Sequence, residues 1–122
     1  MSKIRGKNTG IELKLMKAMR VSGITRFVYQ KKMFGNPDFV FEKQRVAVFC
    51  DGDFWHGYRF NKWKGKLNKF WIEKISTNIK RDGVVSRTLE KEKWHVIRFW
   101  EHQIKKDPKK CVDKVANILV MK

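Results

Sequence analysis

The stretch Val-Ala-Val-Phe-Cys-Asp-Gly-Asp-Phe-Trp-His-Gly, residues Val46 to Gly57, organises the rest of the chain. Its first half is rich in strand-forming residues, and its second half holds acids, aromatics and a histidine. This pattern is typical of a buried strand that leads into a polar site. Upstream, residues 35–41 predict a turn and a second apolar strand, which begins after Asp38. If the two strands pair as a hairpin, Asp38 and Asp51 lie at the same end of the sheet.

The net charge indicates what kind of molecule the protein binds. The 122 residues carry a formal charge of +17, which predicts a polyanionic partner, most often nucleic acid. A membrane surface is the alternative, but no apolar run approaches the length of a spanning helix. A chain of this length predicts one domain, residues 1–122.

The cysteines and the N-terminus bear on the cellular compartment. Cys50 and Cys111 lie far apart in the sequence and give neither a metal-ligand spacing nor a disulfide framework. The N-terminus is basic and polar, and it lacks the apolar core of a secretory signal. We therefore expect an intracellular protein with reduced thiols.

The remaining sequence predicts further helices and strands. Thr9 to Glu12 match a capping box, so we expect a helix that ends at Gly23, and capping is the ordinary role of Glu12. Strands are expected at residues 26–32, 39–41, 45–49 and 94–100, a basic loop at 58–69, a long helix at about 69–91 and a terminal helix from Pro108. A strand, a long helix and another strand form a crossover unit. The sequence therefore predicts an α/β fold with a central mixed four-stranded sheet flanked by helices, in the order α-β-β-β-α-β-α.

One stripe of the long predicted helix mixes polar with apolar residues. Its members are three or four residues apart, and they are Trp71, Ile75, Asn78, Asp82, Val85 and Leu89. Residues at this spacing share one face of a helix. Because the apolar members turn this face inward, Asn78 and Asp82 need partners inside the protein.

The acids and the histidine suggest metal-dependent hydrolysis. Magnesium binds one or two carboxylates together with water and a substrate phosphate, and Asp38 and Asp51 supply that minimal site. His56 has a suitable acidity for a general base, and an inward-facing Asp82 would fix its tautomer. Taken alone, a histidine beside Phe54 and Trp55 is more often a core or turn residue than a catalytic one.

Several segments resemble the very short patch repair (Vsr) endonucleases. They are Gly35 to Val40, Val48 to Gly57, Phe70 to Asp82 and Trp94 to Glu101, and Lys7 to Glu12 fits as well. The Phe-Trp-His-Gly and Asn-x-x-x-Asp elements are the specific ones. The resemblance implies a PD-(D/E)XK, restriction-endonuclease-like core and a magnesium-dependent enzyme that nicks double-stranded DNA at a T:G mismatch. It also implies mismatch-repair proteins as possible partners and a cytoplasmic, nucleoid-associated location for a protein of prokaryotic or phage origin.

The resemblance assigns roles to residues of this chain. It implies that Asp38 and the main-chain carbonyl of Cys50 bind the metal, with Asp51 beside the water there. His56 corresponds to the general base, Asp82 to its acidic partner, and Glu12 to a catalytic glutamate that also caps the first helix.

DNA contacts follow partly from the resemblance and partly from the basic loop. Phe54 and Trp55 correspond to aromatics that intercalate, and the N-terminal arm with Met1 and Lys3 closes on the other groove. The loop interleaves cations with aromatics, which suits phosphate neutralisation and stacking. Its expected DNA contacts are Lys62, Trp63, Lys64, Lys66 and Lys69.

The chain also departs from the family pattern. Asp53 stands where ordinary members of the fold have the (D/E)XK lysine, which leaves His56 as the base. The positions of the family's structural zinc read Asp53, Tyr58 and His102, so we expect no closed zinc site. Two alternatives remain open: a site-specific endonuclease of the homing or restriction type, and a catalytically silent DNA-binding module.

Overall fold

The centre of the molecule is a four-stranded sheet in the order β1-β2-β3-β4, seen in a computed structural model that describes residues 9–122. The strands are β1 (Val28–Tyr29), β2 (Phe39–Phe41), β3 (Val46–Asp51) and β4 (His95–Trp100). β2 pairs antiparallel with both β1 and β3, whereas β3 and β4 run parallel in a register that pairs Asp51 with Trp100. The sheet is therefore mixed, as the sequence predicts.

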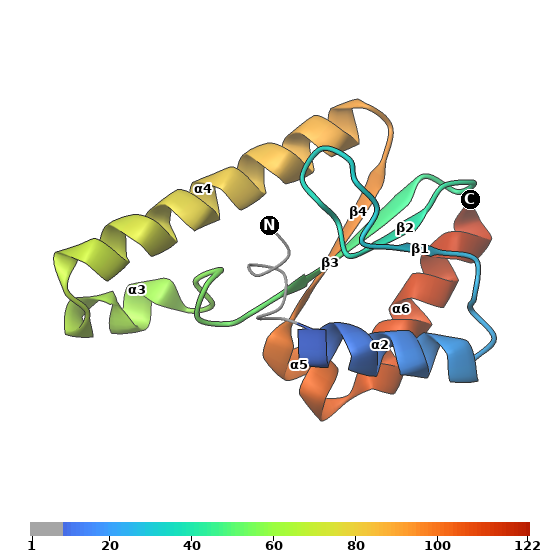
Figure 1. Cartoon of the computed structure of the whole chain (residues 1–122), viewed down its shortest axis with the longest axis horizontal. Helices are drawn as coiled ribbons and strands as arrows, with labels where there is room; N and C mark the ends of the chain where they lie inside the picture. The colour runs from blue at the N-terminus through green and yellow to red at the C-terminus, as the bar shows by residue number, and fades with distance from the viewer. Residues whose placement is uncertain (1–8) are drawn as a thin grey trace.

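Helices cover both faces of the sheet (Figure 1). They are α2 (Thr9–Val21), α3 (Phe60–Trp63), the 3-10 helix η1 (Lys64–Lys66), α4 (Lys69–Lys91), α5 (Glu101–Lys106) and α6 (Pro108–Met121). The long helix α4 lies on one face, and α2, α5 and α6 lie on the other (Figure 1). The predicted α/β class, with a mixed sheet flanked by helices, is confirmed.

Two apolar clusters hold these layers together. The larger one joins side chains of α2 and α6 to one face of the sheet, with Leu15, Phe39 and Val115 fully buried. The smaller one joins α4 to the other face through Ala47, Phe49, Val85 and Leu89. Because β3 is covered on both faces, all six of its residues are buried. This fixes the end of β3, and with it Asp51, inside the protein.

The structure differs from the prediction in three local places. Residues 58–69 are not simply a loop, because α3 and η1 form there around the buried ring of Phe60. The six-residue helix α5 was not predicted, since it is too short to show a periodic pattern and is held by the buried side chain of Ile104. The edge strand is shorter than residues 26–32, with β1 limited to two residues.

The helix ends follow local sequence signals. The side chain of Asn68 accepts a hydrogen bond from the backbone N–H of Trp71 and caps α4, and Asp107 caps α6 before Pro108 in the same way. The predicted contacts of Met1 and Lys3 lie outside the described residues. Within residues 9–122, no helix is both long enough and apolar enough to cross a membrane.

Candidate active site

The hairpin of β2 and β3 brings two acids to one end of the sheet. Asp38 directly precedes β2, and Asp51 is the last residue of β3. The backbone N–H of Cys50 donates a hydrogen bond of 2.7 Å to Oδ2 of Asp38. Both residues are buried, since Asp38 is 8% exposed and Asp51 is 5% exposed. They line a cavity of about 480 Å³, together with residues that include Glu12, Cys50, His56, Asp82 and Arg98.

The loop after β3 carries His56 to this cavity. Backbone hydrogen bonds close the loop, from the N–H of His56 to the carbonyl of Gly52 and from Tyr58 to Asp53. Gly57 has a φ of 76°, and it packs against Ile79 of α4. From the inward stripe of α4, Asn78 donates to the carbonyl of Trp55 over 3.0 Å. The loop therefore supplies the partners that the polar residues of the stripe need, with Trp55 contacting Asn78 and His56 contacting Asp82.

His56 and Asp82 form a close pair. Nδ1 of His56 is 2.5 Å from Oδ2 of Asp82 and 3.8 Å from Oδ1 of Asp51. An ionised carboxylate only accepts hydrogen bonds, so Nδ1 carries the proton in this contact and Nε2 is left for another partner. Burial lowers the pKa of His56, but the hydrogen bond to Asp82 and the charges of Asp51 and Asp82 outweigh it, so the pKa is raised.

Arg98 of β4 is part of this cluster, although the sequence analysis gave it no role. Its Nη1 lies 3.1 Å from each carboxylate oxygen of Asp51, and its guanidinium lies 4.1 Å from the ring centre of Phe49. Burial raises the pKa of Asp51, while Arg98 and His56 act in the opposite direction. The sequence does contain a feature from which this role could have been predicted: Arg98 is a single cation in the apolar run His95 to Trp100, on the side of the strand that faces α4.

Glu12 reaches the same cavity from α2. It is almost fully buried, with 1% exposed, and its Oε1 accepts hydrogen bonds from Tyr29 (2.7 Å) and from Nε2 of Gln30 (3.0 Å). These contacts tie the Glu12 carboxylate to the β1 edge of the sheet. The side chain of Thr9 lies outside the described part of the chain, so the predicted capping box remains a prediction.

The donor groups of the cavity suit a hard cation better than a soft one. Burial, together with the charges of Asp38, Glu12 and Asp51, raises the pKa of the Cys50 thiol well above its usual value. That thiol is therefore neutral, and oxygen atoms are the available ligands. Within residues 9–122, the only group of three clustered metal-ligand side chains is Asp51, His56 and Asp82. In this group the histidine and both acids already contact one another or Arg98.

Aromatic rings gather next to the cavity, where Phe54 is 39% exposed. Its ring stacks on that of Trp63 with 5.4 Å between centres, and it meets the edge of Trp55 at 5.3 Å. Trp55 in turn packs against Trp71 of α4. Lys62, Lys64, Lys66 and Lys69 are all exposed, and the first three lie within three residues of Trp63 in the chain. The contacts of these aromatic and basic residues with DNA remain predictions.

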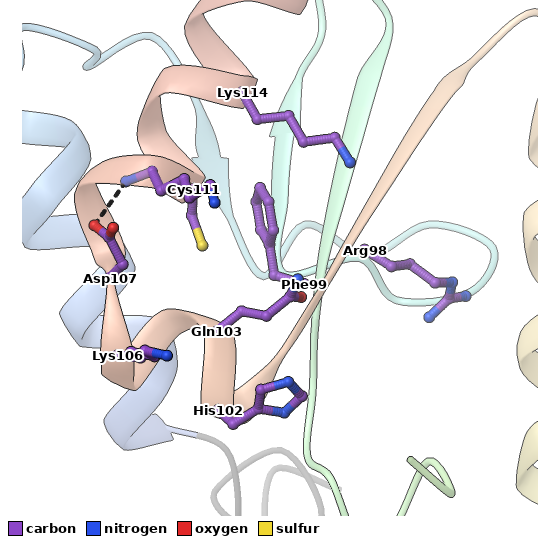
Figure 2. A pocket seen from close by; sticks show the side chains of 9 residues that line it. Arg98, Phe99, His102, Gln103, Lys106, Asp107, Cys111 and Lys114 are labelled. Carbon is purple, nitrogen blue, oxygen red and sulfur yellow. Dashed lines mark hydrogen bonds between the residues drawn. The ribbon is translucent and has the colours of Figure 1, made fainter. Parts of the chain in front are cut away.

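The three residues at the positions of the family's structural zinc, Asp53, Tyr58 and His102, lie in contact. Nδ1 of His102 is 3.0 Å from Oδ1 of Asp53, and the rings of His102 and Tyr58 are 4.3 Å apart. On the other side of β4, a second cavity of about 370 Å³ lies between that strand, α5 and α6, with His102, Lys106 and Cys111 among its walls (Figure 2). This cavity contains none of the other predicted site residues.

Acids at strand ends, a histidine–carboxylate pair and a strongly basic chain are the features of a nuclease. Residues 1–62 match the family model described as DNA mismatch endonuclease Vsr. The chain belongs to the Vsr family, and it is a DNA endonuclease.

Similar proteins are found in several bacteria. The type II nicking enzyme V.NmeDIP of Neisseria meningitidis serogroup C is 42% identical over 91% of this chain and 77% of its own length. V.HpaIIP of Haemophilus parainfluenzae, also a type II nicking enzyme, is 38% identical over 87% of this chain and 77% of its own length. The DNA mismatch endonuclease Vsr of Escherichia coli (strain K12) is 32% identical over 83% of this chain and 66% of its own length.

Proposed function

We propose that this protein is a magnesium-dependent endonuclease that nicks one strand of duplex DNA at a T:G mismatch. The observation that carries the proposal is the contact of His56 with Asp82, in the same cavity as the carboxyl groups of Asp38 and Asp51. The family match and the names of the similar proteins support both the mismatch and the nicking.

The metal would be held by Asp38 and the main-chain carbonyl of Cys50, with Asp51 beside it. Strand geometry supports this pairing. The N–H of Cys50 points to Asp38, and the N–H and carbonyl of one residue in an antiparallel pair face the same neighbouring strand. The Cys50 carbonyl is thus on the side of Asp38, where only oxygen ligands meet, as magnesium prefers. A bound ion would polarise the scissile phosphate and stabilise the charge that develops during displacement.

The protein groups around the phosphate have separate roles in the proposal. Nε2 of His56 takes a proton from a water molecule, whose oxygen forms the new bond to phosphorus while a bond to a bridging oxygen breaks. Asp82 holds the proton on Nδ1 and stabilises the imidazolium. Glu12, which is buried and fixed by Tyr29 and Gln30, orients water in the cavity.

The surface beside the cavity would hold the DNA. Phe54 and Trp55 would wedge into the base stack, and the ring of Trp63 supports that of Phe54 by stacking on it. The phosphates would be neutralised by Lys62, Lys64, Lys66 and Lys69, with Met1 and Lys3 of the N-terminal arm on the other groove. We place this reaction on DNA in the bacterial cytoplasm, where mismatch-repair proteins are the expected partners.

The test compares two labelled duplexes that differ only by one T:G mismatch, each incubated with the protein and magnesium. We expect a nick in one strand of the mismatched duplex only. Asp38→Ala and His56→Ala should abolish nicking and leave salt-sensitive DNA binding nearly unchanged. A variant of either residue that cuts at the parental rate would show that its assigned role is wrong.

Site-specific nicking is the second candidate function, because several similar proteins are named type II nicking enzymes. Cutting of both duplexes at one sequence would favour this candidate. Binding of both duplexes without any cleavage, unchanged in His56→Ala, would instead indicate a silent DNA-binding module.

A further inference from the structure

Arg98 connects β4 to Asp51 and Asp82, the two acids that lie near His56. Its Nη1 contacts both carboxylate oxygens of Asp51, its Nη2 donates to the main-chain carbonyl of Asp82 over 3.2 Å, and its Nε donates to Oγ of Ser86 over 2.8 Å. Arg98 also lines the second cavity, but Figure 2 shows its guanidinium pointing away from His102 and Cys111. The described hydrogen bonds of the guanidinium go to Asp51, Asp82 and Ser86.

We propose that Arg98 is a positioning residue that directs His56 to Asp82 and fixes α4 against the sheet. This inference rests on the proposed function, in which His56 acts as the base. Arg98 itself contacts neither water nor phosphate in this role. It acts through the carboxylate of Asp51 and the backbone of Asp82.

The first part of the role is electrostatic. Two carboxylates, those of Asp51 and Asp82, lie near the same ring nitrogen of His56, at 3.8 Å and 2.5 Å. Without a cation they would repel each other, and both would attract the imidazole. Nη1 of the guanidinium lies 3.1 Å from Oδ1 of Asp51 but 4.0 Å from Oδ1 of Asp82, so Arg98 pairs more closely with Asp51 and neutralises it. His56 therefore keeps its hydrogen bond to Asp82.

The second part of the role concerns the position of α4. The carbonyl of Asp82 and the hydroxyl of Ser86 lie one helical turn apart, and a single guanidinium contacts both. The planar, rigid donor fork of arginine suits such a contact, because its nitrogens point in fixed directions. The ring of Phe49 lies against the guanidinium and limits its movement. Rotation or sliding of α4 that moved Asp82 away from His56 would also have to break these bonds.

The experiment compares Arg98→Met and Arg98→Lys with Arg45→Met as the matched control. Arg45 also lies over an aromatic ring, that of Trp94 at 4.7 Å, and donates to a main-chain carbonyl, that of Glu92, but it is remote from the cavity. We expect Arg98→Met to lower kcat by about 10- to 100-fold with little change in KM, because small misplacements of catalytic groups cost about this much. Arg98→Lys should recover part of the loss, and Arg45→Met should behave as the parent.

A double variant and a spectrum separate positioning from simple loss of stability. If Arg98 acts through Asp51, adding Asp51→Asn to Arg98→Met should lower kcat much less than the product of the single effects. In metal-free protein, the Nδ1 proton of His56 should give a protected, downfield NMR signal. We expect Arg98→Met to lose this signal and Arg45→Met to keep it.

The outcomes separate this inference from the proposed function. A parent that nicks, together with an Arg98→Met variant of parental kcat, would overturn the inference alone. If the parent nicks no duplex, the proposed function fails, and an unchanged His56 signal in Arg98→Met would then overturn the positioning role as well. If Arg98→Met does not fold, the same readouts on Arg98→Lys decide, and parental kcat with an unchanged signal would refute the role.

Discussion

At the scale of single residues, the chemistry depends on how the environment of His56 sets its protonation. The side chain is partly buried, which disfavours the charged imidazolium. Two acids act against this effect, and the pKa of His56 is raised. A raised pKa keeps the imidazole protonated to a higher pH, and a protonated imidazole cannot accept a proton from water. In the proposed function, His56 can therefore act as the base only above this raised pKa.

The first residue-scale prediction concerns Asp82→Asn. The amide removes the negative charge and the charged hydrogen bond, so the pKa of His56 should fall and the acidic limb of the pH–rate profile should move to lower pH. The maximal rate should fall by at least about 10-fold, because the tautomer is no longer fixed. The measurement is the pH dependence of kcat for nicking.

Asp53→Asn is the matched control for that profile, because Asp53 contacts a different histidine, His102, at 3.0 Å. Its acidic limb should coincide with that of the parent. A limb that stays in place in Asp82→Asn would contradict the assignment of His56 as the base.

The raised pKa of His56 also affects the stability of the protein. The His56 pair contributes stability below the pKa of an unfolded histidine, and this contribution is lost as the pH rises through the folded pKa.

At the scale of elements, the active site depends on the contact of the 52–58 loop with α4. Gly57 lies against Ile75 and Ile79, and Asn78 holds the carbonyl of Trp55. One face of α4 therefore supplies the surface on which the loop packs, the hydrogen bond that fixes it, and the acid that pairs with its histidine. A change in this contact should alter both the stability and the activity of the protein.

The element-scale prediction concerns Gly57→Ala. A Cβ at this position would lie 2.5 Å from Cδ1 of Ile79, and the φ of 76° disfavours any side chain. The Cβ would also lie 2.9 Å from Cγ1 of Ile79, so the whole Ile79 side chain must shift, and we expect a loss of at least about 1–2 kcal/mol in the free energy of unfolding from the backbone and the repacking together. Denaturant unfolding measures this loss, and nicking should fall because the loop carries His56.

Gly83→Ala is the control in the interior of α4, where the new Cβ would meet only the flexible end of Arg87. It should leave stability unchanged or raise it by about 0.5–1 kcal/mol, because alanine favours the helix. Equal effects of the two substitutions would argue against a special role for the turn at Gly57.

At the scale of the whole molecule, charge governs the affinity for DNA. A formal charge of +17 attracts any polyanion, so the location of the cations decides which of them contact the substrate. Lys62 of α3 and Lys64 and Lys66 of η1 are exposed and lie within three residues of Trp63, whose ring stacks on that of Phe54. They are therefore expected to contribute more to DNA binding than lysines at the opposite end of the sheet.

The whole-molecule prediction compares two triple variants of equal charge. Replacing Lys62, Lys64 and Lys66 with glutamine should lower the slope of log K against log salt by up to about 3, close to one unit for each lost phosphate contact. The control replaces Lys43 in the turn before β3, Lys91 at the end of α4 and Lys93 in the turn before β4, all near the other end of β3 and β4. Equal slopes in the two variants would show that binding follows net charge only.

The sequence by itself determined the elements and the ends of the strands that matter most. Apolar spacing placed α4 at Lys69–Lys91 and predicted that Asp82 faces inward. The hairpin pattern placed Asp38 and Asp51 at one end of the sheet, and the structure brings both into the cavity with His56. These features could be predicted because they depend on periodicity and on neighbours along the chain.

Only the tertiary structure decided how the acids are partnered. Asp51 pairs with Arg98, which is 47 residues away in the chain, and Glu12 is bound by Tyr29 and Gln30. No local pattern specifies such contacts, since they arise where separate elements meet. The short helices α3 and α5 belong to the same group. A helix of four or six residues is not stable alone, so it forms only where packing of Phe60 or Ile104 against the rest of the protein stabilises it.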